Sequence, residues 1–353
     1  MRAARYHTPG KPLRIEDIPE PTLRPGSAIV RVVSTFVAPY VQEMVDATQP
    51  YGFPPLPFTP GMDSIGVIEQ VADDVRGLEV GETVFCDHYY TATNLTSRAE
   101  SCYIGVFGKG EASQAIMARW RDGSFAEKMI LPAECFTPLR SAARVHVDLL
   151  VRLGWFGTCY GAFLRAELRP GQTVVVNAAT GLVGTCGVLL ARAMGAGRIV
   201  AVGRKRAVLK ELEALDPRLI LSLPADSPDA AKALKDAARG ADVVLDCVGD
   251  ITDPTSTNNA LASLGPFGTA VLVGGLNAPL AINAKWVLDQ QVRILGSSWF
   301  PRWASAAMLA MIGNGTLDVS ALRAHRYPLE RVNEAAAAAA KGPGGFDHVV
   351  LVP

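Results

Sequence analysis

Hydrophobic residues in the first part of the chain come in short runs separated by Pro and Gly. Examples are SAIVRVVSTFV (27–37), SIGVIEQVA (64–72) and ETVFCDHYY (82–90), which are rich in β-branched and aromatic residues. Short runs of this composition, bounded by turn residues, are typical of β-strands. Residues 1 to about 140 are therefore expected to form an all-β or barrel-like unit.

The pattern changes from about residue 145 onward. Continuous apolar runs, such as TVVVNA (173–178), RIVAVG (198–203), DVVLDCVG (242–249) and TAVLVGG (269–275), alternate with amphipathic helical stretches. Strands buried on both faces of a parallel sheet show such continuous runs, because helices cover both faces. This part of the chain is expected to be an α/β unit. An alanine-rich helix and a short strand are expected in the last 25 or so residues.

Length and charge narrow the class of protein. A chain of 353 residues that is 49% hydrophobic can bury a full core and is expected to divide into two domains. The 34 basic and 34 acidic residues cancel, and no basic run is interleaved with aromatic residues. Attraction to nucleic acid or to an anionic membrane is therefore not expected. A small molecule fits better as the partner.

Membrane and cysteine patterns point to an ordinary soluble chain. Met1 is followed by strand-like sequence rather than an apolar signal region, and no run of about 18 apolar residues is present. The expected compartment is the cytoplasm. The six cysteines lack C-x-x-C spacing, which argues against a disulfide framework and a zinc knuckle. Most are expected to be buried free thiols.

The strongest functional pattern lies between residues 173 and 206. A strand-like run is followed by the turn Ala179-Thr-Gly181-Leu-Val-Gly184, a helical stretch and a second strand. Glycines in such a turn let the backbone approach a pyrophosphate, which lies at the positive end of the helix. The strand before and the helix after make the pattern specific for a dinucleotide, although Ala179 stands where the first glycine is usual. The alternative is a tight turn without a ligand.

The end of the second strand indicates which dinucleotide is bound. NAD sites place Asp or Glu there to accept hydrogen bonds from the ribose 2′-hydroxyl. This chain has Gly203, Arg204 and Lys205 instead, followed by Arg206. The glycine leaves room, and the basic groups suit a phosphate dianion. We therefore predict NADPH over NADH, with a solvated basic start of a helix as the alternative.

Four segments together resemble the medium-chain dehydrogenase/reductase superfamily, over essentially the whole chain. They are PGMDSIGVIEQVADDVRGLEVGETV (60–84), GSFAEKMILPAECFTPL (123–139), GTCYGAFLRAELRPGQTVVVNAATGLVG (157–184) and VVLDCVG (243–249). The resemblance implies a partly open β-barrel (GroES-like) catalytic domain of residues 1–145 and 300–353. It implies a Rossmann doubly wound parallel sheet in residues 146–299 and an active site in the cleft. Homodimers through the edge of this sheet are implied too, with residues 268–283 as the candidate interface.

The resemblance also assigns the residues that contact the cofactor. The glycine turn and the end of the second strand contribute to this set, together with residues that follow the later strands. The assigned residues are Thr158, Ala179, Thr180, Gly181, Leu182, Val183, Gly203, Arg204, Lys205, Cys247, Val248, Gly274, Gly275, Ser297 and Ser298.

The superfamily contains zinc-dependent alcohol dehydrogenases and zinc-free reductases, which differ at three ligand positions. Where zinc-dependent members have a cysteine, a histidine and a second cysteine or an acid, the matching residues here are Val37, Met62 and Gly154. Valine and glycine side chains have no donor atom, and a thioether is a poor ligand for Zn²⁺. The only remaining donor is Asp63, which matches a position where family members keep a carboxylate beside the metal. We therefore expect no catalytic zinc.

A structural zinc is not expected either. The segment from residue 81 to 127 is long enough for the cysteine-rich lobe of zinc-dependent members, but contains only Cys86 and Cys102, with His88 nearby. These three donors fall short of a tetrahedral set. Typical quinone reductases have a much shorter segment here, so the chain resembles an alcohol dehydrogenase plan that has lost both metals.

Without a metal, another group must stabilise the charge that develops as hydride reaches the acceptor. Reduction of a simple ketone places that charge on one oxygen and usually demands a strong electrophile or a well-placed acid. An alkene conjugated to a carbonyl spreads it into an enolate, which hydroxyl or N–H groups can stabilise. We therefore expect an enone, quinone or iminium-like acceptor. A zinc-free ketone or alcohol dehydrogenase and a catalytically inactive NADPH-binding protein are the alternatives.

The candidate catalytic residues are Tyr40, Asp63 and His88. Tyr40 lies in the segment of the first ligand position and carries a phenol that can protonate an enolate; simple barrel packing is the alternative. His88 is expected either to titrate near neutral pH or to lie on the surface. The residues that would border the cleft are aromatic, and as a group they suggest a bulky hydrophobic substrate rather than a small sugar or polyol. Ordinary packing at the domain interface is the alternative. These aromatic residues are Tyr51, Phe53, Tyr89, Trp155, Phe156 and Trp299.

Overall fold

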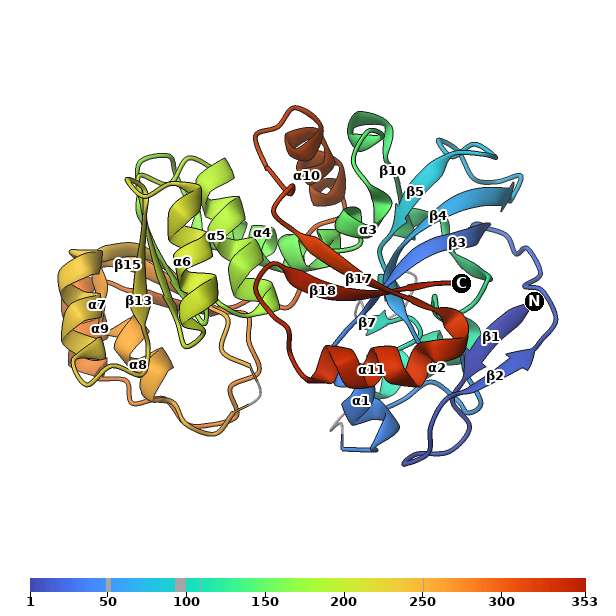
Figure 1. Ribbon diagram of the computed structural model, residues 1–353, viewed down its shortest axis with the longest axis horizontal. Coiled ribbons are helices and arrows are strands. Elements are labelled where there is room, and N and C mark those ends of the chain that lie inside the picture. The colour runs from blue at the N-terminus through green and yellow to red at the C-terminus, as the bar shows by residue number, and fades with distance from the viewer. Residues whose placement is uncertain (49–51, 93–99, 109, 250) are drawn as a thin grey trace. The chain divides into compact units, whose positions relative to one another are not determined.

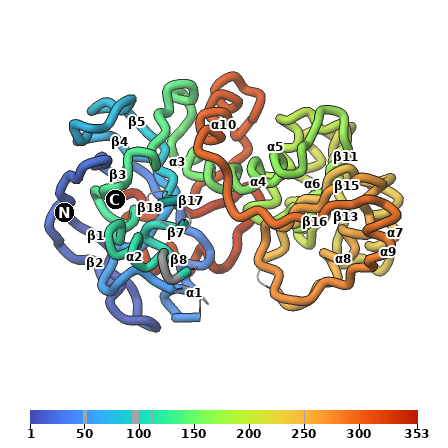
Figure 2. The backbone as a smooth tube through the Cα atoms, turned by 180° about the vertical axis from the view of Figure 1, so that it is seen from behind, coloured from blue at the N-terminus to red at the C-terminus, as the bar shows by residue number. Residues whose placement is uncertain are grey.

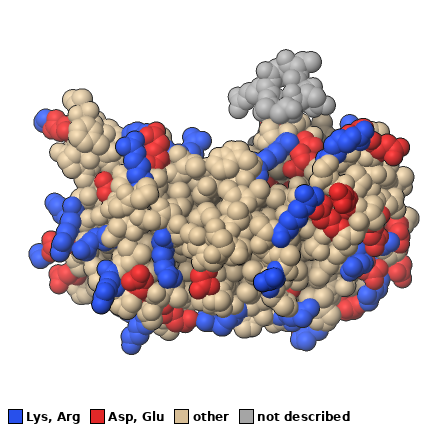
Figure 3. Space-filling model, turned by 90° about the horizontal axis from the view of Figure 1, so that it is seen from above, with Lys and Arg blue, Asp and Glu red and all other residues tan. Residues whose placement is uncertain are grey.

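The computed structural model describes residues 1–48, 52–92, 100–108, 110–249 and 251–353. They form two compact units. The barrel unit contains residues 1–154, 322–343 and 347–353, and the Rossmann unit contains residues 155–321 and 344–346. Across the described ranges, no helix is long and apolar enough to cross a membrane. Basic and acidic side chains are interspersed on the face shown in Figure 3, in keeping with the balanced charge.

The strands of the barrel unit are mostly short, as its turn-rich sequence predicts. Their bounds are β1 (Arg2–Arg5), β2 (Arg14–Asp17), β3 (Ser27–Val37), β4 (Met62–Val71), β5 (Thr83–Cys86), β6 (Tyr89–Ala92), β7 (Glu100–Tyr103), β8 (Phe107–Gly108), β9 (Lys128–Pro132), β10 (Phe136–Pro138), β17 (Arg323–Pro328) and β18 (Asp347–Val352). The helices are α1 (Tyr40–Val45), α2 (Glu111–Arg119), α3 (Val147–Leu150) and α11 (Val332–Ala340), with 3₁₀ turns at Ala133–Cys135, Arg140–Ala142 and Leu329–Arg331.

The largest sheet of the barrel unit joins segments from both ends of the chain. β3 pairs antiparallel with β4, β9 and β18, and β18 carries β17 in parallel. Figure 1 shows the red strands β17 and β18 beside the blue strands β3 and β4. Most residues of β3 are buried, because side chains on both of its faces are covered. The C-terminal tail is therefore part of the barrel sheet.

The alanine-rich helix α11 buries one stripe of its surface. Val332, Ala335, Ala336 and Ala339 are buried, which is the spacing of one face of an α-helix. Their small side chains allow α11 to lie close to α1 and β18. Gly342, with a φ of 61°, follows the helix and ends it as the sequence predicts.

The elements of the Rossmann unit alternate between strand and helix. Their bounds are β11 (Thr173–Asn177), α5 (Leu182–Ala193), β12 (Arg198–Gly203), α6 (Arg206–Leu215), β13 (Ile220–Pro224), α7 (Ala230–Ala238), β14 (Ala241–Asp246), α8 (Thr255–Leu261), β15 (Leu264–Leu272), α9 (Ala284–Gln290), β16 (Arg293–Gly296) and α10 (Trp303–Gly313). Helix α4 (Leu153–Ala166) precedes them and begins at the end of the barrel unit.

The six strands of the Rossmann unit form one parallel sheet in the order β13-β12-β11-β14-β15-β16. This is the 3-2-1-4-5-6 order of a doubly wound dinucleotide fold. Val174, Val175 and Val176 of the central strand are fully buried, as their continuous apolar run predicts. The predicted fold class, a Rossmann doubly wound sheet with a partly open β-barrel, is confirmed.

The strand register aligns the carboxyl ends of the sheet. Asn177 lies opposite Val202 on one side and Asp246 on the other, and Asp246 in turn lies opposite Leu272. Leu272 then pairs with Gly296 at the end of β16. The segments that follow these strands therefore leave the same edge of the sheet, which is where open α/β folds bind ligands.

The sheet edge on the side of β15 is formed by β16. Seen from behind in Figure 2, the orange strands β15 and β16 run next to each other. β15 also pairs with β14, so residues 268–272 of the expected dimer interface lie inside the sheet rather than at its edge.

Candidate functional site

The turn between β11 and α5 has the close backbone packing of a phosphate-binding loop. Ala178 takes a left-handed backbone conformation, with a φ of 55°, and Ala179 N donates to Val202 O over 2.7 Å. A Cβ built on Gly184 would lie 2.2 Å from Ala178 O, so only glycine fits there. Gly181 is the N-cap of α5, so the N-terminal end of the helix lies at the turn. This geometry suits a pyrophosphate at the helix N-terminus.

The end of β12 carries the basic residues of the predicted site. Gly203 is buried, and a Cβ there would lie 2.5 Å from the side chain of Thr180. Arg204 and Lys205 are exposed. Arg206 is engaged with Asp226, at 2.9 Å between Nη2 and Oδ1. Glycine at 203 therefore brings the strand end close to the glycine turn, with two basic side chains directly after it.

The other assigned cofactor residues follow β14, β15 and β16 or lie on α4. Cys247 and Val248 are buried after β14, and a Cβ on Gly274 would lie 1.8 Å from Val248 O, so the two loops touch. Ser297 is buried after β16, and its hydroxyl has no hydrogen-bond partner in the described part of the chain. Thr158 is buried on α4. The structure thus brings most of the assigned set to one edge of the sheet.

A buried polar pair at this edge was missed by sequence reasoning. Asn177 ends β11 and Asp246 ends β14, and Asn177 Nδ2 donates to Asp246 Oδ1 over 2.7 Å. Both side chains are buried. Burial raises the pKa of Asp246 above its usual value, against the hydrogen bonds from Asn177 and Thr257. A signal was present in the sequence, because both residues are polar positions at the ends of otherwise apolar runs.

In the barrel unit, Tyr40, Met62 and Asp63 lie close together. Tyr40 begins α1, and its hydroxyl donates to the Met62 sulfur at the start of β4. Burial raises the pKa of the Tyr40 phenol well above its usual value, and the proximity of Asp63 acts in the same direction. The Met62 carbonyl accepts hydrogen bonds from Thr35 and Ser124, at 3.0 and 2.9 Å, which hold the start of β4 in place.

Asp63 carries a carboxyl that is buried in the barrel unit. It is 1% exposed, and neither side-chain oxygen has a partner among the described residues. Burial raises the pKa of Asp63 well above its usual range, and the nearby Asp87 raises it further. An unpaired carboxylate is very costly in such a place, so the neutral acid is the favoured form.

The residues at the three ligand positions do not fit a zinc ion. Val37 and Met62 are buried, and a Cβ built on Gly154 would lie 2.0 Å from Asp63 Oδ2 and 2.5 Å from its Cγ. The Asp63 carboxyl therefore occupies the space that a side chain at position 154 would need. Within the described ranges, no three His, Cys, Asp or Glu side chains are grouped so as to hold a metal ion.

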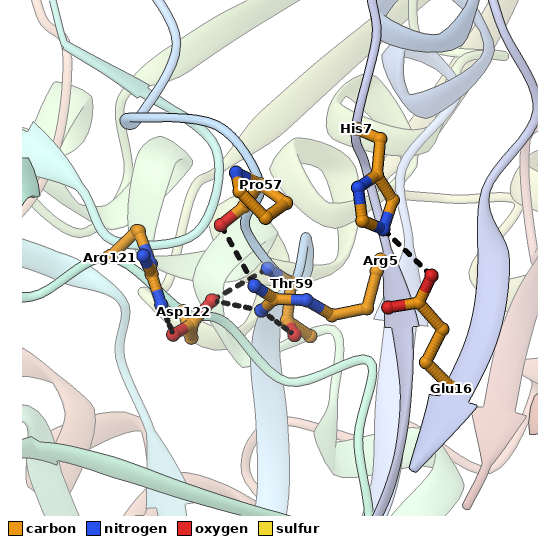
Figure 4. Close-up of polar contacts among 7 residues, drawn as sticks. All are labelled: Arg5, His7, Glu16, Pro57, Thr59, Arg121 and Asp122. Carbon is orange, nitrogen blue, oxygen red and sulfur yellow. Dashed lines mark hydrogen bonds and ion pairs between the residues drawn. The ribbon is translucent and has the colours of Figure 1, made fainter. Parts of the chain in front are cut away.

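The Pro-Gly turn before Met62 is held by a charged clamp (Figure 4). Arg5 is buried, and its guanidinium donates to Asp122 Oδ1 over 2.7 Å, to Thr59 Oγ1 over 3.0 Å and to Pro57 O over 2.8 Å. Thr59 N also donates to Asp122, over 2.7 Å. Gly61 then crosses close to Ser124 and its neighbour, where a Cβ would meet atoms at 2.6 Å. The clamp fixes the chain just before the Met62 and Asp63 pair.

The expectations for His88 are wrong. Its side chain is fully buried, and Nδ1 lies 3.0 Å from the carbonyl oxygen of Ile104. Burial lowers the pKa of His88 to about 4, so the imidazole is neutral near pH 7. The residue neither titrates near neutral pH nor lies on the surface. In the sequence His88 is only a polar residue that follows a strand, which does not indicate that its side chain is buried.

The predicted aromatic residues fall into separate clusters. In the barrel unit, Phe53 contacts Tyr6 and Phe58, while Tyr89 contacts Tyr103. Tyr103 also contacts Phe107, and Phe107 contacts Tyr40. A row of neighbouring rings therefore runs from Tyr89 to Tyr40.

The remaining predicted aromatic residues lie in the Rossmann unit. Trp155 is half-buried, Phe156 is buried and Trp299 stacks on Phe300. Tyr51 lies outside the described residues.

A small apolar cavity lies beside Tyr40 in the barrel unit. Its walls include Phe36, Met44, Met62 and Phe125. Tyr40 itself is one of the lining residues. The volume of about 10 Å³ is room for roughly one water molecule, so the cavity by itself does not hold a substrate group.

Two family models match the chain. One describes the alcohol dehydrogenase GroES-like domain and matches residues 24–141. The other describes a zinc-binding dehydrogenase and matches residues 183–313. These two segments lie in the barrel unit and the Rossmann unit respectively.

Two curated relatives and one solved structure are similar to the chain. An NAD-dependent alcohol dehydrogenase of Sulfurisphaera tokodaii is 26% identical over 309 residues, covering 84% of this chain and 85% of the relative. A quinone oxidoreductase of Mus musculus is 24% identical over 360 residues, covering 100% and 98%. A cobalt- and zinc-bound alcohol dehydrogenase from Pyrobaculum aerophilum has a TM-score of 0.78 at 24% identity, covering 100% and 99%.

These findings agree with the fold and with the geometry of the glycine turn. They identify the chain as an oxidoreductase of the alcohol dehydrogenase and quinone oxidoreductase type. The resemblance inferred from its four sequence segments is thereby confirmed. The chain belongs to the medium-chain dehydrogenase/reductase superfamily.

Proposed function

We propose that this protein is an NADPH-dependent, zinc-independent reductase of activated double bonds. The acceptor class comprises enones, quinones and iminium-like compounds that carry a bulky hydrophobic group. The observation that carries the proposal is the Asp63 carboxyl, which fills the space beside Gly154 where a ligand side chain would lie. Val37 and Met62 at the other two ligand positions add no suitable donor.

Bound NADPH would supply the hydride. Gly181 and Gly184 shape the turn for the pyrophosphate, and Arg204 and Lys205 are the candidate partners of the 2′-phosphate. The phenol of Tyr40 is the candidate proton donor, since an enolate takes up a proton after hydride transfer. Its raised pKa keeps it protonated near pH 7.

Cofactor preference is tested by measuring KM for NADPH and NADH with one acceptor. We expect a lower KM for NADPH, and this preference should shrink in a variant with Arg204→Ser and Lys205→Ser. Arg206→Ser is the matched control, because Arg206 already pairs with Asp226. An NADH preference in the unmodified protein would exclude the NADPH assignment.

Acceptor class is tested by following NADPH absorbance with enones, quinones, imines and simple ketones. We expect turnover of activated acceptors, with the rate unchanged after dialysis against a strong zinc chelator. Loss of activity on chelation, restored by zinc, would contradict the metal-free mechanism. Tight NADPH binding without turnover of any acceptor would favour a catalytically inactive binding protein. Full turnover in Tyr40→Phe would remove Tyr40 as the proton donor.

A homodimer through the Rossmann sheet is part of the same proposal. The edge strand β16 and the preceding helix α9 support it, because α9 buries none of its residues and Leu288 is 74% exposed. A hydrophobic residue in that position suits contact with a second copy. Analytical ultracentrifugation of Leu288→Glu, beside the unmodified protein, tests this contact. A cytoplasmic location and a small-molecule partner, without nucleic acid or membrane, complete the proposal.

A further inference from the structure

Asn177 and Asp246 form a fully hydrogen-bonded polar pair at the carboxyl edge of the Rossmann sheet. Asp246 accepts from Asn177 Nδ2 over 2.7 Å and from Thr257 Oγ1 over 3.1 Å. Asn177 Oδ1 accepts from Ser256 Oγ over 2.8 Å and from Ala178 N over 3.1 Å. Each partner thus has a defined role as donor or acceptor, which an apolar pair could not reproduce.

The main chain of the pair ties neighbouring loops together. Asn177 O accepts from Cys247 N over 3.1 Å, at the start of the loop after β14. Asp246 O accepts from Val273 N over 3.0 Å and from Gly274 N over 3.2 Å, at the start of the loop after β15. Two segments assigned to the cofactor therefore begin at these residues, and a third, the loop after β15, is hydrogen-bonded to Asp246.

Side-chain hydrogen bonds also hold the second end of the loop after β14, where α8 begins. Ser256 and Thr257 lie in the first turn of α8, and they donate to Asn177 and Asp246 respectively. The loop that contains Cys247 and Val248 is thus fastened at both ends to the same pair. A buried pair between strands is well suited to this task, because groups carried by strands are positioned more precisely than groups carried by loops.

We propose that Asn177 and Asp246 are a positioning pair that holds the glycine turn and the loop after β14 in the arrangement that binds the dinucleotide. The inference rests on the proposed function only in that the chain binds NADPH. Neither residue has to touch the cofactor. Their effect is to remove the need to order two loops when the cofactor arrives, which lowers the free-energy cost of binding.

Asn177 donates and Asp246 accepts, so substitution of one residue should weaken cofactor binding, whereas exchange of both residues should not. Asn177→Asp would place a second carboxyl against Asp246, at the 2.7 Å separation of the present hydrogen bond. Two carboxylates at this separation repel each other, so the pair must take up a proton or move apart, and the neutral N–H donor of Asn177 is lost in either case. Exchange of both residues, Asn177→Asp with Asp246→Asn, restores one donor between them. It also keeps acceptors for Ser256, Ala178 and Thr257, so the network closes again.

The experiment compares Kd for NADPH by isothermal titration calorimetry in four proteins. They are the unmodified chain, Asn177→Asp, the exchanged double variant, and Asp242→Asn as the matched control. Asp242 lies at the other end of β14, where Oδ2 accepts from Thr173 N over 2.8 Å. We expect Kd to rise about tenfold or more in Asn177→Asp, and to stay within about twofold in the other two.

Folding is monitored for each variant by circular dichroism at the assay temperature. If Asn177→Asp does not fold, Thr257→Val serves in its place, since it leaves one Asp246 oxygen without its donor; a Kd rise of several-fold is expected there. Unchanged Kd in a folded Asn177→Asp, or no recovery in the folded double variant, would overturn the positioning role. If the unmodified chain binds no dinucleotide, the proposed function fails instead, so the two failures are distinguishable.

Discussion

Substitution of Gly154 by alanine tests whether the Asp63 carboxyl fills the space beside position 154. A Cβ at position 154 would lie 2.0 Å from Oδ2 and 2.9 Å from Oδ1 of Asp63. Nonbonded heavy atoms prefer separations of roughly 3.5 Å or more, so the carboxyl must move. Asp63 is 1% exposed, which leaves it little space to move into.

The expected energies follow from two opposing effects. Alanine in place of glycine within a helix stabilises by about 1 kcal/mol. Forcing extra atoms into a packed site costs about 1–3 kcal/mol. Gly154→Ala should therefore lower the free energy of unfolding by up to about 2 kcal/mol. In an Asp63→Ala background the clash is gone, so the same substitution should be neutral or stabilising by up to about 1 kcal/mol.

The assay is a double-mutant cycle measured by urea unfolding of the four proteins. We expect a coupling energy of about 2 kcal/mol between positions 63 and 154. Asp63→Asn is the control background, because it keeps the shape of the side chain and should keep the penalty at Gly154. An equal effect of Gly154→Ala in the unmodified and Asp63→Ala backgrounds would refute the steric reasoning.

Three further outcomes are expected. Gly184→Ala, whose Cβ would lie 2.2 Å from Ala178 O, should weaken NADPH binding in calorimetry by tenfold or more, and unchanged binding would argue against the phosphate turn. Burial lowers the pKa of His88 to about 4, from about 6.5 in the unfolded chain, so the native state binds fewer protons between these two pH values. The free energy of unfolding should therefore fall by on the order of 3 kcal/mol as pH drops from 6.5 to 4. A pH-independent difference between the parent and His88→Gln in urea unfolding would contradict this. Asp122→Ala should lower the free energy of unfolding in urea by about 2 kcal/mol, because it leaves the buried Arg5 without its carboxylate partner. An unchanged free energy of unfolding would show that the contacts of Arg5 with Asp122 add nothing to stability.

Local sequence was sufficient for the fold class and the cofactor turn. Continuous apolar runs alternating with helical stretches predicted a parallel sheet, because strands covered on both faces need apolar side chains throughout. The spacing of Gly181 and Gly184 predicted the turn, since the limits there are set by nearby backbone atoms such as Ala178 O. Such constraints act over a few residues and can be read along the chain.

Burial of individual polar groups could not be predicted in the same way. His88 was expected to be titratable or exposed, but the contact with Ile104 depends on how its segment folds inward. Of the expected dimer segment, residues 268–283, the first five lie in β15, whereas the edge strand of the sheet is β16. Strand order is set by pairing between distant segments, which leaves no local trace.

The three substituted ligand positions illustrate the division most clearly. The identities of Val37, Met62 and Gly154 alone exclude the usual zinc ligands, because metal coordination depends on donor atoms that a side chain either has or lacks. That the Asp63 carboxyl lies in the space beside Gly154, and that Asn177 meets Asp246, followed only from the folded chain. These contacts join residues separated by 91 and 69 positions, respectively, and only the close packing of strands and helices brings them within reach.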